Sequence, residues 1–233
     1  MDFLEYIHFQ MNKFSSILFL GLSLTTLVST VDSFDSYATL SEPGGFCQSI
    51  STNAAGTMLA TGSYDDNVYI YSISNSGVSI SQTITGFNED VNSVGFSTDG
   101  VTFFGTELNG GIKVFKDNGS GQFASHQNIS GSATQGGCMS GDAQFLVRSE
   151  NPMLRIYKIN ASSQYDSLQN ISIPEGSYVC HFSDNNTFLF VAFNTSQIFK
   201  YDGSLYQSHQ TINTNNASGI PTMDYKSPYL LLP

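Results

Sequence analysis

The stretch that decides the fold runs from Gly86 to Lys116 and reads GFNEDVNSVGFSTDGVTFFGTELNGGIKVFK. It contains three short runs of β-prone residues, separated by two turns. The runs are Val91–Phe96, Val101–Thr106 and Ile112–Lys116. The first turn ends in Gly100, which can take a positive φ without Cβ strain, and the second contains Asn109-Gly110, a strong hairpin signal. The stretch therefore predicts one antiparallel β-meander.

Two sequence markers recur along the chain with the same period. In the first, an aromatic or aliphatic residue precedes a Leu or Ile by six positions, and the Leu or Ile positions step by 44, 45, 42 and 41. These pairs are Phe34/Leu40, Val78/Ile84, Phe123/Ile129, Tyr165/Ile171 and Tyr206/Ile212. The second marker is an aliphatic residue followed by an aromatic one: Ile70-Tyr71, Val114-Phe115, Ile156-Tyr157 and Ile198-Phe199. A period of about 40–45 residues that holds four strands is typical of a β-propeller blade.

The repeat predicts an all-β fold, a β-propeller of four-stranded antiparallel blades. The predicted complete blades are 46–85, 91–130, 136–172 and 178–213, within a repeat region of 34–233. A partial fifth blade occupies 220–233, and 34–41 form the outer strand of the closing blade. The chain stops in an apolar run, Tyr229–Leu232, with no further strand to cover it. We therefore expect an incomplete, truncated propeller that a longer gene product or a second chain completes.

At these residues the sequence resembles the WD40 family of β-propellers and the similar YVTN-type propellers. Thr83–Phe87, Val91–Phe96, Asp99-Gly100 and Ile112–Phe115 follow the family's blade pattern in order, and the resemblance covers nearly everything after residue 34. The chain has no Trp, so the Trp-Asp dipeptide is absent, and Phe87 stands where the family has His. The place of the family's Trp, at the end of the third strand, is taken by Tyr71, Phe115, Tyr157 and Phe199. The Asp that the family has in the turn before the third strand is kept only at Asp65 or Asp66. Elsewhere it is replaced by Asn109, Asn151 and Asn194. The resemblance implies a rigid platform for a protein partner.

Composition limits the kinds of partner and of cross-link. The 233 residues include 8 Lys+Arg and 19 Asp+Glu, which gives a formal net charge of −11. Such a surface repels phosphate backbones, so we expect no nucleic-acid partner. Three Cys allow at most one intrachain bridge, and we interpret Cys47, Cys138 and Cys180 as small buried hydrophobic residues on inner strands.

The N-terminal segment is typical of a signal peptide. Residues Phe14–Val28 are apolar, Lys13 precedes them, and small or uncharged residues follow at Ser29–Ser33. The apolar run is shorter than the roughly 20 residues that a membrane span needs. We predict that 1–33 form a signal peptide, with Met11 as the working start, so that no stable membrane span is left after cleavage. The alternative is an uncleaved anchor.

Seven acceptor sequences for N-glycosylation are predicted to lie in turns, connections or outermost strands. They are at Asn118, Asn128, Asn160, Asn170, Asn185, Asn194 and Asn216. None of them falls in a predicted inner strand, where a glycan could not fit. Together with the signal segment, they favour a glycoprotein that is secreted or resides in the lumen of the secretory pathway.

No set of residues has the spacing of a catalytic, metal or cofactor site, and we expect none of the three. His126 and His209 hold the same place in two blades, which we interpret as shared ancestry of the blades. The acidic pair Asp65-Asp66 is expected to stabilise a turn. The few polar residues on predicted inner strands are Asn92, His181 and Asp224.

The leading hypothesis is a secreted, non-enzymatic β-propeller that serves as a protein-binding scaffold. The alternative is an extracellular propeller enzyme, lactonase-like or quinoprotein-like, whose site lies in further blades. A third possibility, an intracellular adaptor, requires that the apolar N-terminus is not a signal.

Overall fold

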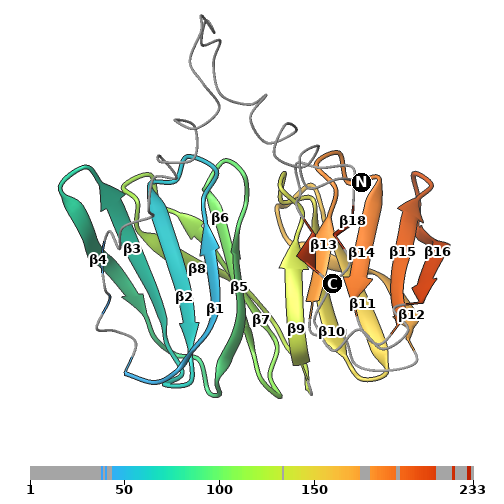
Figure 1. Ribbon diagram of the computed structural model, residues 1–233, viewed down its shortest axis with the longest axis horizontal. Helices are drawn as coiled ribbons and strands as arrows, with labels where there is room; N and C mark the ends of the chain where they lie inside the picture. The colour runs from blue at the N-terminus through green and yellow to red at the C-terminus, as the bar shows by residue number, and fades with distance from the viewer. Residues whose placement is uncertain are drawn as a thin grey trace, which may run out of the picture. The chain divides into compact units, whose positions relative to one another are not determined.

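Every described element of the computed structural model is a β-strand (Figure 1). The structure describes residues 38, 40, 44–132, 134–173, 179–192, 195–213, 222–223 and 230–231. The described strands form four four-stranded antiparallel sheets and one two-stranded hairpin. The predicted all-β fold with four-stranded antiparallel blades is therefore confirmed. The predicted signal peptide lies outside the described residues, as does the predicted outer strand 34–41 apart from Ala38 and Leu40, which are not in a strand.

In each blade the four strands follow one another in chain order, so every connection is a hairpin. Blade one has β1 (Cys47–Thr52), β2 (Met58–Ser63), β3 (Val68–Ser74) and β4 (Gly77–Ile84), and blade two has β5 (Val91–Phe96), β6 (Thr102–Glu107), β7 (Ile112–Asp117) and β8 (Phe123–Ile129). Blade three has β9 (Thr134–Met139), β10 (Phe145–Glu150), β11 (Met153–Ile159) and β12 (Tyr165–Ser172), and blade four has β13 (Val179–Phe182), β14 (Phe188–Ala192), β15 (Thr195–Tyr201) and β16 (Tyr206–Asn213). The hairpin pairs β17 (Thr222–Met223) with β18 (Leu230–Leu231).

The turn between the first and second strands has the same construction in blades two to four. Its fourth residue is left-handed: Gly100 has a φ of 72°, as expected, and Ala143 and Asn186 adopt 56° and 57° in the same place. A Ser at the start of the turn bonds to the Asp or Asn two residues later, as Ser97 Oγ does to Asp99. This side-chain bond favours the turn independently of Gly.

The hydrophobic core lies between neighbouring sheets. Ala60, Val68 and Ile70 of blade one form a cluster with Val91, Val94 and Phe103 of blade two, and similar clusters join blades two and three and blades three and four. The aromatic residues in the Trp position are all buried: Tyr71, Phe115, Tyr157 and Phe199. Burial of each such side chain contributes roughly 1.5–3 kcal/mol, so neighbouring blades stabilise one another.

A repeated glutamine latch connects the outer strands of neighbouring blades. In each case one Gln amide makes two hydrogen bonds of 2.7–3.0 Å to the main chain of the first residue in the next outer strand. The pairs are Gln82 with Phe123, Gln127 with Tyr165 and Gln169 with Tyr206. Each Gln lies opposite the aliphatic residue of the third-strand marker, next to a register shift. The latch therefore belongs to the repeat.

Two buried tyrosines close the turns of blades three and four. Tyr165 Oη donates to the carbonyl of Ala143 at 2.7 Å, and Tyr206 Oη donates to the carbonyl of Asn186 at 2.9 Å. Burial, helped by the charge of Asp142, raises the pKa of Tyr165, and burial together with Tyr201 and Asp142 raises the pKa of Tyr206. Both side chains are therefore held in their neutral form.

We expect stability to fall steeply above pH 10. An unfolded Tyr has a pKa near 10, so below that pH both states are neutral and the full stabilisation is present. As the pH rises further, only the unfolded state can lose these protons, which costs up to about 1.4 kcal/mol per pH unit for each Tyr. Urea unfolding at pH 8 and pH 11 should show a shallower loss for Tyr165→Phe/Tyr206→Phe than for the parent. Equal losses in the two proteins would contradict this account.

Candidate functional site

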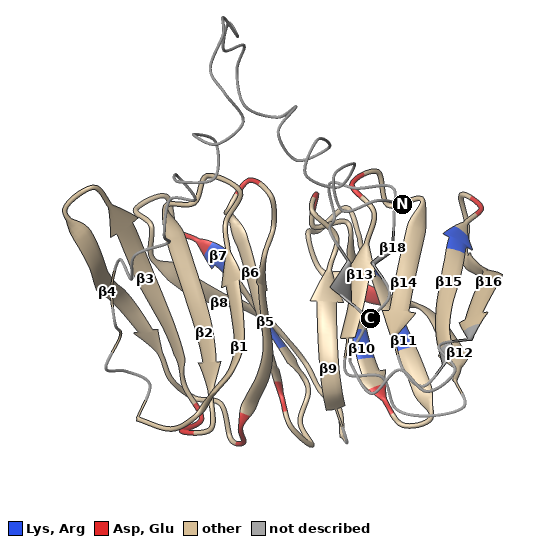
Figure 2. Cartoon of the chain, viewed as in Figure 1, with Lys and Arg blue, Asp and Glu red and all other residues tan. Residues whose placement is uncertain are grey.

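A polar pair is repeated where the second strand turns into the third. In blade one Tyr69 Oη donates to Asp65 Oδ2 at 2.8 Å, and in blade two Lys113 pairs with Glu107. In blade three Arg155 takes the place of Tyr69 and Lys113 and pairs with Glu150. Most acidic residues lie in the turns at the ends of strands (Figure 2). The charged residues within the strands include Glu107, Lys113, Arg148, Glu150 and Arg155 of this repeated set, and also Lys116, Asp117, Lys158, Asp166 and Lys200.

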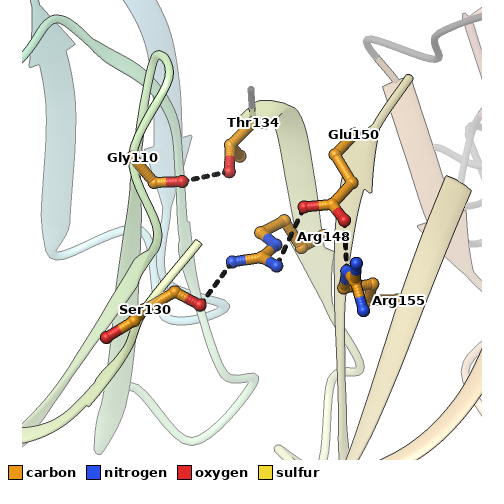
Figure 3. A network of polar contacts seen from close by, with 6 residues as sticks. All are labelled: Gly110, Ser130, Thr134, Arg148, Glu150 and Arg155. Atoms are coloured by element: carbon orange, nitrogen blue, oxygen red, sulfur yellow. Dashed lines mark hydrogen bonds and ion pairs between the residues drawn. The ribbon is translucent and has the colours of Figure 1, made fainter. Parts of the chain in front are cut away.

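In blade three the polar pair belongs to a larger network that includes a second arginine (Figure 3). Arg148 Nη2 lies 2.9 Å from Glu150 Oε2, and Arg155 Nε bonds to the other oxygen of the same carboxylate. Arg148 Nη1 also donates to the carbonyl of Ser130 at 2.8 Å, in the connection from blade two. Only 3% of Arg148 is exposed. The network therefore joins blade three to the end of blade two.

A glycine makes room for this network. A Cβ on Gly131 would lie 1.4 Å from Arg148 Nη1, so only Gly can stand beside the guanidinium. Nearby, Thr134 Oγ1 donates to the carbonyl of Gly110 across the same two blades (Figure 3). Both oxygens of Glu150 are held by arginines of blade three, so this carboxylate serves as a structural acceptor, and Arg148 makes the link to blade two.

The acidic turn of blade one has the structural role that the sequence predicted. Asp65 Oδ2 accepts hydrogen bonds from the main chain of Gly44 and from Tyr69 Oη, both at 2.8 Å. Partial burial alone would raise the pKa of Asp65, but the hydrogen bonds from Tyr69, Ser63 and Gly44 outweigh it and lower the pKa below its ordinary value. The carboxylate is thus stabilised in its charged form within the turn.

The structure does not assemble the inner-strand candidates into one site. Asn92 donates to the carbonyl of Thr134 at 3.1 Å and accepts from Thr106, so both atoms of its amide bind neighbouring strands. His181 lies half-buried on β13, and Asp224 lies outside the described residues. His126 on β8 bonds to the carbonyl of Ser163 in the next blade at 2.7 Å, which gives its repetition a structural reason.

The interpretation of the three cysteines as buried hydrophobic residues is confirmed for Cys138, which is 8% exposed, and is wrong for Cys47, which is exposed. Cys138 on β9 and Cys180 on β13 form a disulfide that joins the inner strands of blades three and four. Cys47 is exposed and is a free thiol. The inner strands of neighbouring blades lie side by side, which brings the two cysteines to a Cα–Cα distance of 5.7 Å, within the range for a disulfide.

The predicted glycosylation sites differ in accessibility. Four are exposed: Asn128 and Asn170 on the outer strands β8 and β12, and Asn118 and Asn185 in turns. Asn160 is half-buried, and its Nδ2, the atom that would carry the glycan, donates to Asp166 at 2.9 Å. In Asn118 and Asn185 only Oδ1 is engaged, by bonds that shape the turn. Asn194 and Asn216 lie outside the described residues.

Blade one carries an exposed apolar patch, which we define as Phe46, Ile50 and Tyr64. Their exposed fractions are 80%, 67% and 45%, and the rings of Phe46 and Tyr64 meet edge to face at 6.0 Å. Val94, which holds the place of Ile50 in blade two, is only 9% exposed because blade one covers it. Ile50 therefore lies on the side of the inner strand β1 that no described blade covers, whereas Phe46 precedes β1 and Tyr64 lies in the turn after β2.

Two kinds of feature are absent from the part of the chain that is described. No group of three or more His, Cys, Asp or Glu side chains there is arranged to hold a metal ion. No described helix has the length and apolarity needed to cross a membrane.

Comparison of the structure with solved proteins finds repeated matches to one architecture. Sqt1 of Saccharomyces cerevisiae matches with a TM-score of 0.61 and 16% identity, over 72% of this chain and 48% of that one. A putative 6-phosphogluconolactonase from Bacteroides uniformis gives 0.63 and 17%, over 72% and 55%. A protein from Lactobacillus plantarum gives 0.61 and 14%, over 76% and 58%. The chain has a β-propeller fold.

These similarities establish the fold alone, because all three identities are below 20%. The chain spans about half the length of the solved structures that it matches. No family model and no curated protein matches the sequence. Because proteins of this fold serve several functions, the function has to be argued from the residues of this chain.

Proposed function

We propose that the protein is a secreted or lumenal, non-enzymatic β-propeller of WD40-like repeats that serves as a protein-binding scaffold. The observation that carries this proposal is the exposed apolar patch of Phe46, Ile50 and Tyr64. Large apolar side chains that gather on a surface are typical of sites where another protein binds. The four blades provide a rigid support for the patch, because each is packed and hydrogen-bonded to the next.

The secretory location is supported by two features. A disulfide between Cys138 and Cys180 persists where the environment is oxidising, as in the secretory pathway. The exposed positions of Asn118, Asn128, Asn170 and Asn185 would let a glycosylation enzyme and a glycan reach them. The network around Glu150 and the bonds of Asn92 hold blades together, which supports a structural role for these polar residues over catalysis.

We expect the protein from a glycosylating host to carry N-linked glycans. Removal of N-linked glycans by a glycosidase should increase its mobility on a gel. Single Asn→Gln substitutions at the four exposed positions should each remove one glycan and so increase the gel mobility of the untreated protein by a small amount. Asn160→Gln is the matched control within the same set, because its half-buried and hydrogen-bonded amide should be the least glycosylated. Unchanged mobility after the glycosidase would contradict the secretory location.

The non-enzymatic part of the proposal has its own test. The purified protein should show no turnover of a panel of lactones and esters. Turnover that is lost in His181→Ala, with the fold retained by circular dichroism, would show that the protein is an enzyme and would contradict the proposal.

A further inference from the structure

The glutamine latch has two halves: the Gln amide, called here the donor half, and the main-chain residue that it binds, called the acceptor half. Among the described residues, the donor half is free in blade four. Gln210 on β16 lies opposite Ile198 next to a register shift, as Gln127 lies opposite Val114 in blade two. The sequence Ser208-His209-Gln210 repeats Ser125-His126-Gln127, in which both the His and the Gln bond to the next blade. His209 and Gln210 are exposed, and Gln210 has no hydrogen-bond partner among the described residues.

The matching acceptor half is free in blade one. Val78 at the start of β4 lies opposite Ile73, in the register that Phe123, Tyr165 and Tyr206 occupy when a Gln binds their main chain. No described side chain bonds to the main chain of Val78. The carbonyl of Ser76 holds the place of the Ser163 carbonyl that His126 contacts. On the inner strand of the same blade, Ile50 is 67% exposed.

Among the described residues, each chain thus has one free donor half and one free acceptor half of the same contact. We propose that two copies associate head to tail, with blade four of each copy docked on blade one of the other. In this dimer the Gln210 amide makes two hydrogen bonds to the main chain of Val78 in the other copy, and His209 approaches the carbonyl of Ser76. Val179, which is 37% exposed on β13, packs near Ile50 of the other copy.

A two-fold axis relates the two contacts, so that every free half is used and the assembly closes. The inference rests on the proposed function, because it identifies the partner of the apolar patch as a second copy. Since the chain is strongly acidic, with 19 Asp+Glu against 8 Lys+Arg over the full sequence, salt should strengthen the association by screening repulsion.

The test is the mass in solution of the protein secreted from a glycosylating host. Light scattering coupled to size exclusion should give a dimer at micromolar concentration, more strongly in 0.5 M than in 0.05 M NaCl. Gln210→Ala removes four hydrogen bonds per dimer and should weaken association about a hundredfold or more. Ile50→Asp should give a monomer. Gln207→Ala, exposed on the same strand, is the matched control and should leave the dimer unchanged.

The head-to-tail arrangement can also be tested by mixing two variants. A mixture of Gln210→Ala and Ile50→Asp copies contains one intact contact, the Gln210 of the second variant with the Ile50 face of the first. The mixture should therefore form a heterodimer that is tighter than the self-association of Ile50→Asp, although that variant alone is monomeric. A folded parent protein that is monomeric, or a dimer that both substitutions leave intact, would overturn the proposal. A monomer that still carries glycans would overturn the dimer alone and leave the secretory location standing.

Discussion

Replacing Cys138 and Cys180 by Ser should lower the free energy of unfolding by about 2–5 kcal/mol. The disulfide joins residues 42 apart in sequence, and a loop of that length stabilises the folded state by about 3–5 kcal/mol through loss of entropy in the unfolded chain. Beside the bond lies the core shared by blades three and four, which includes Val147 and Val191, so the two blades should separate more easily without it. Urea unfolding followed by circular dichroism measures the difference.

The free thiol provides the control for this prediction. Cys47 is exposed, so Cys47→Ser should change the free energy of unfolding by less than about 0.5 kcal/mol. A thiol reagent should titrate one thiol per native chain and none in Cys47→Ser. Three reactive thiols in the native protein would show that the disulfide is absent.

The fold was predictable because two markers repeat in the sequence at nearly constant spacing. The second marker fixes the third strand of each blade, and its aromatic residue is buried in all four. Neighbouring strands in a blade are joined by short turns, so local signals such as Asp99-Gly100 and Asn109-Gly110 were enough to place them.

Contacts between blades were much harder to predict. The latch glutamines stand two residues before the Ile of the first marker in each blade, as Gln82 stands before Ile84. That spacing was visible, but the partner of each Gln is a main-chain group some 40 residues away, which has no signature in sequence. A search for polar residues at fixed offsets from the markers could have found the set.

The disulfide was missed for a related reason. Cys138 and Cys180 do not occupy equivalent places in their blades. Ser140 and Ser183 begin equivalent turns, so Cys138 corresponds to His181, and Cys180 corresponds to Gly137. The bond is diagonal between two inner strands, and only the packing of one blade on the next shows that the two sulfurs meet.

Glu150→Ala should lower the free energy of unfolding by about 3–5 kcal/mol. The substitution removes the carboxylate that neutralises Arg148, which is 3% exposed and held in place by the carbonyl of Ser130. An unpaired buried charge costs far more than the loss of an exposed ion pair. Arg155 suffers less, because its side chain is 35% exposed and can turn to solvent. The loss should also change little with salt, since buried charges are weakly screened.

Glu107→Ala is the matched control for this prediction. Glu107 holds the same place in blade two, but its cation is the flexible Lys113, whose Nζ can also bond to the carbonyl of Gly86. Because the Lys113 side chain is flexible and more exposed than that of Arg148, 14% against 4%, its ammonium can reach solvent, so the loss should be smaller, about 1–2 kcal/mol. The double variant Arg148→Met/Glu150→Leu should be more stable than Glu150→Ala alone, because replacing both charges by apolar groups removes the need for pairing. Equal losses at Glu107 and Glu150, or a double variant less stable than the single one, would show that the burial of Arg148 does not set the cost.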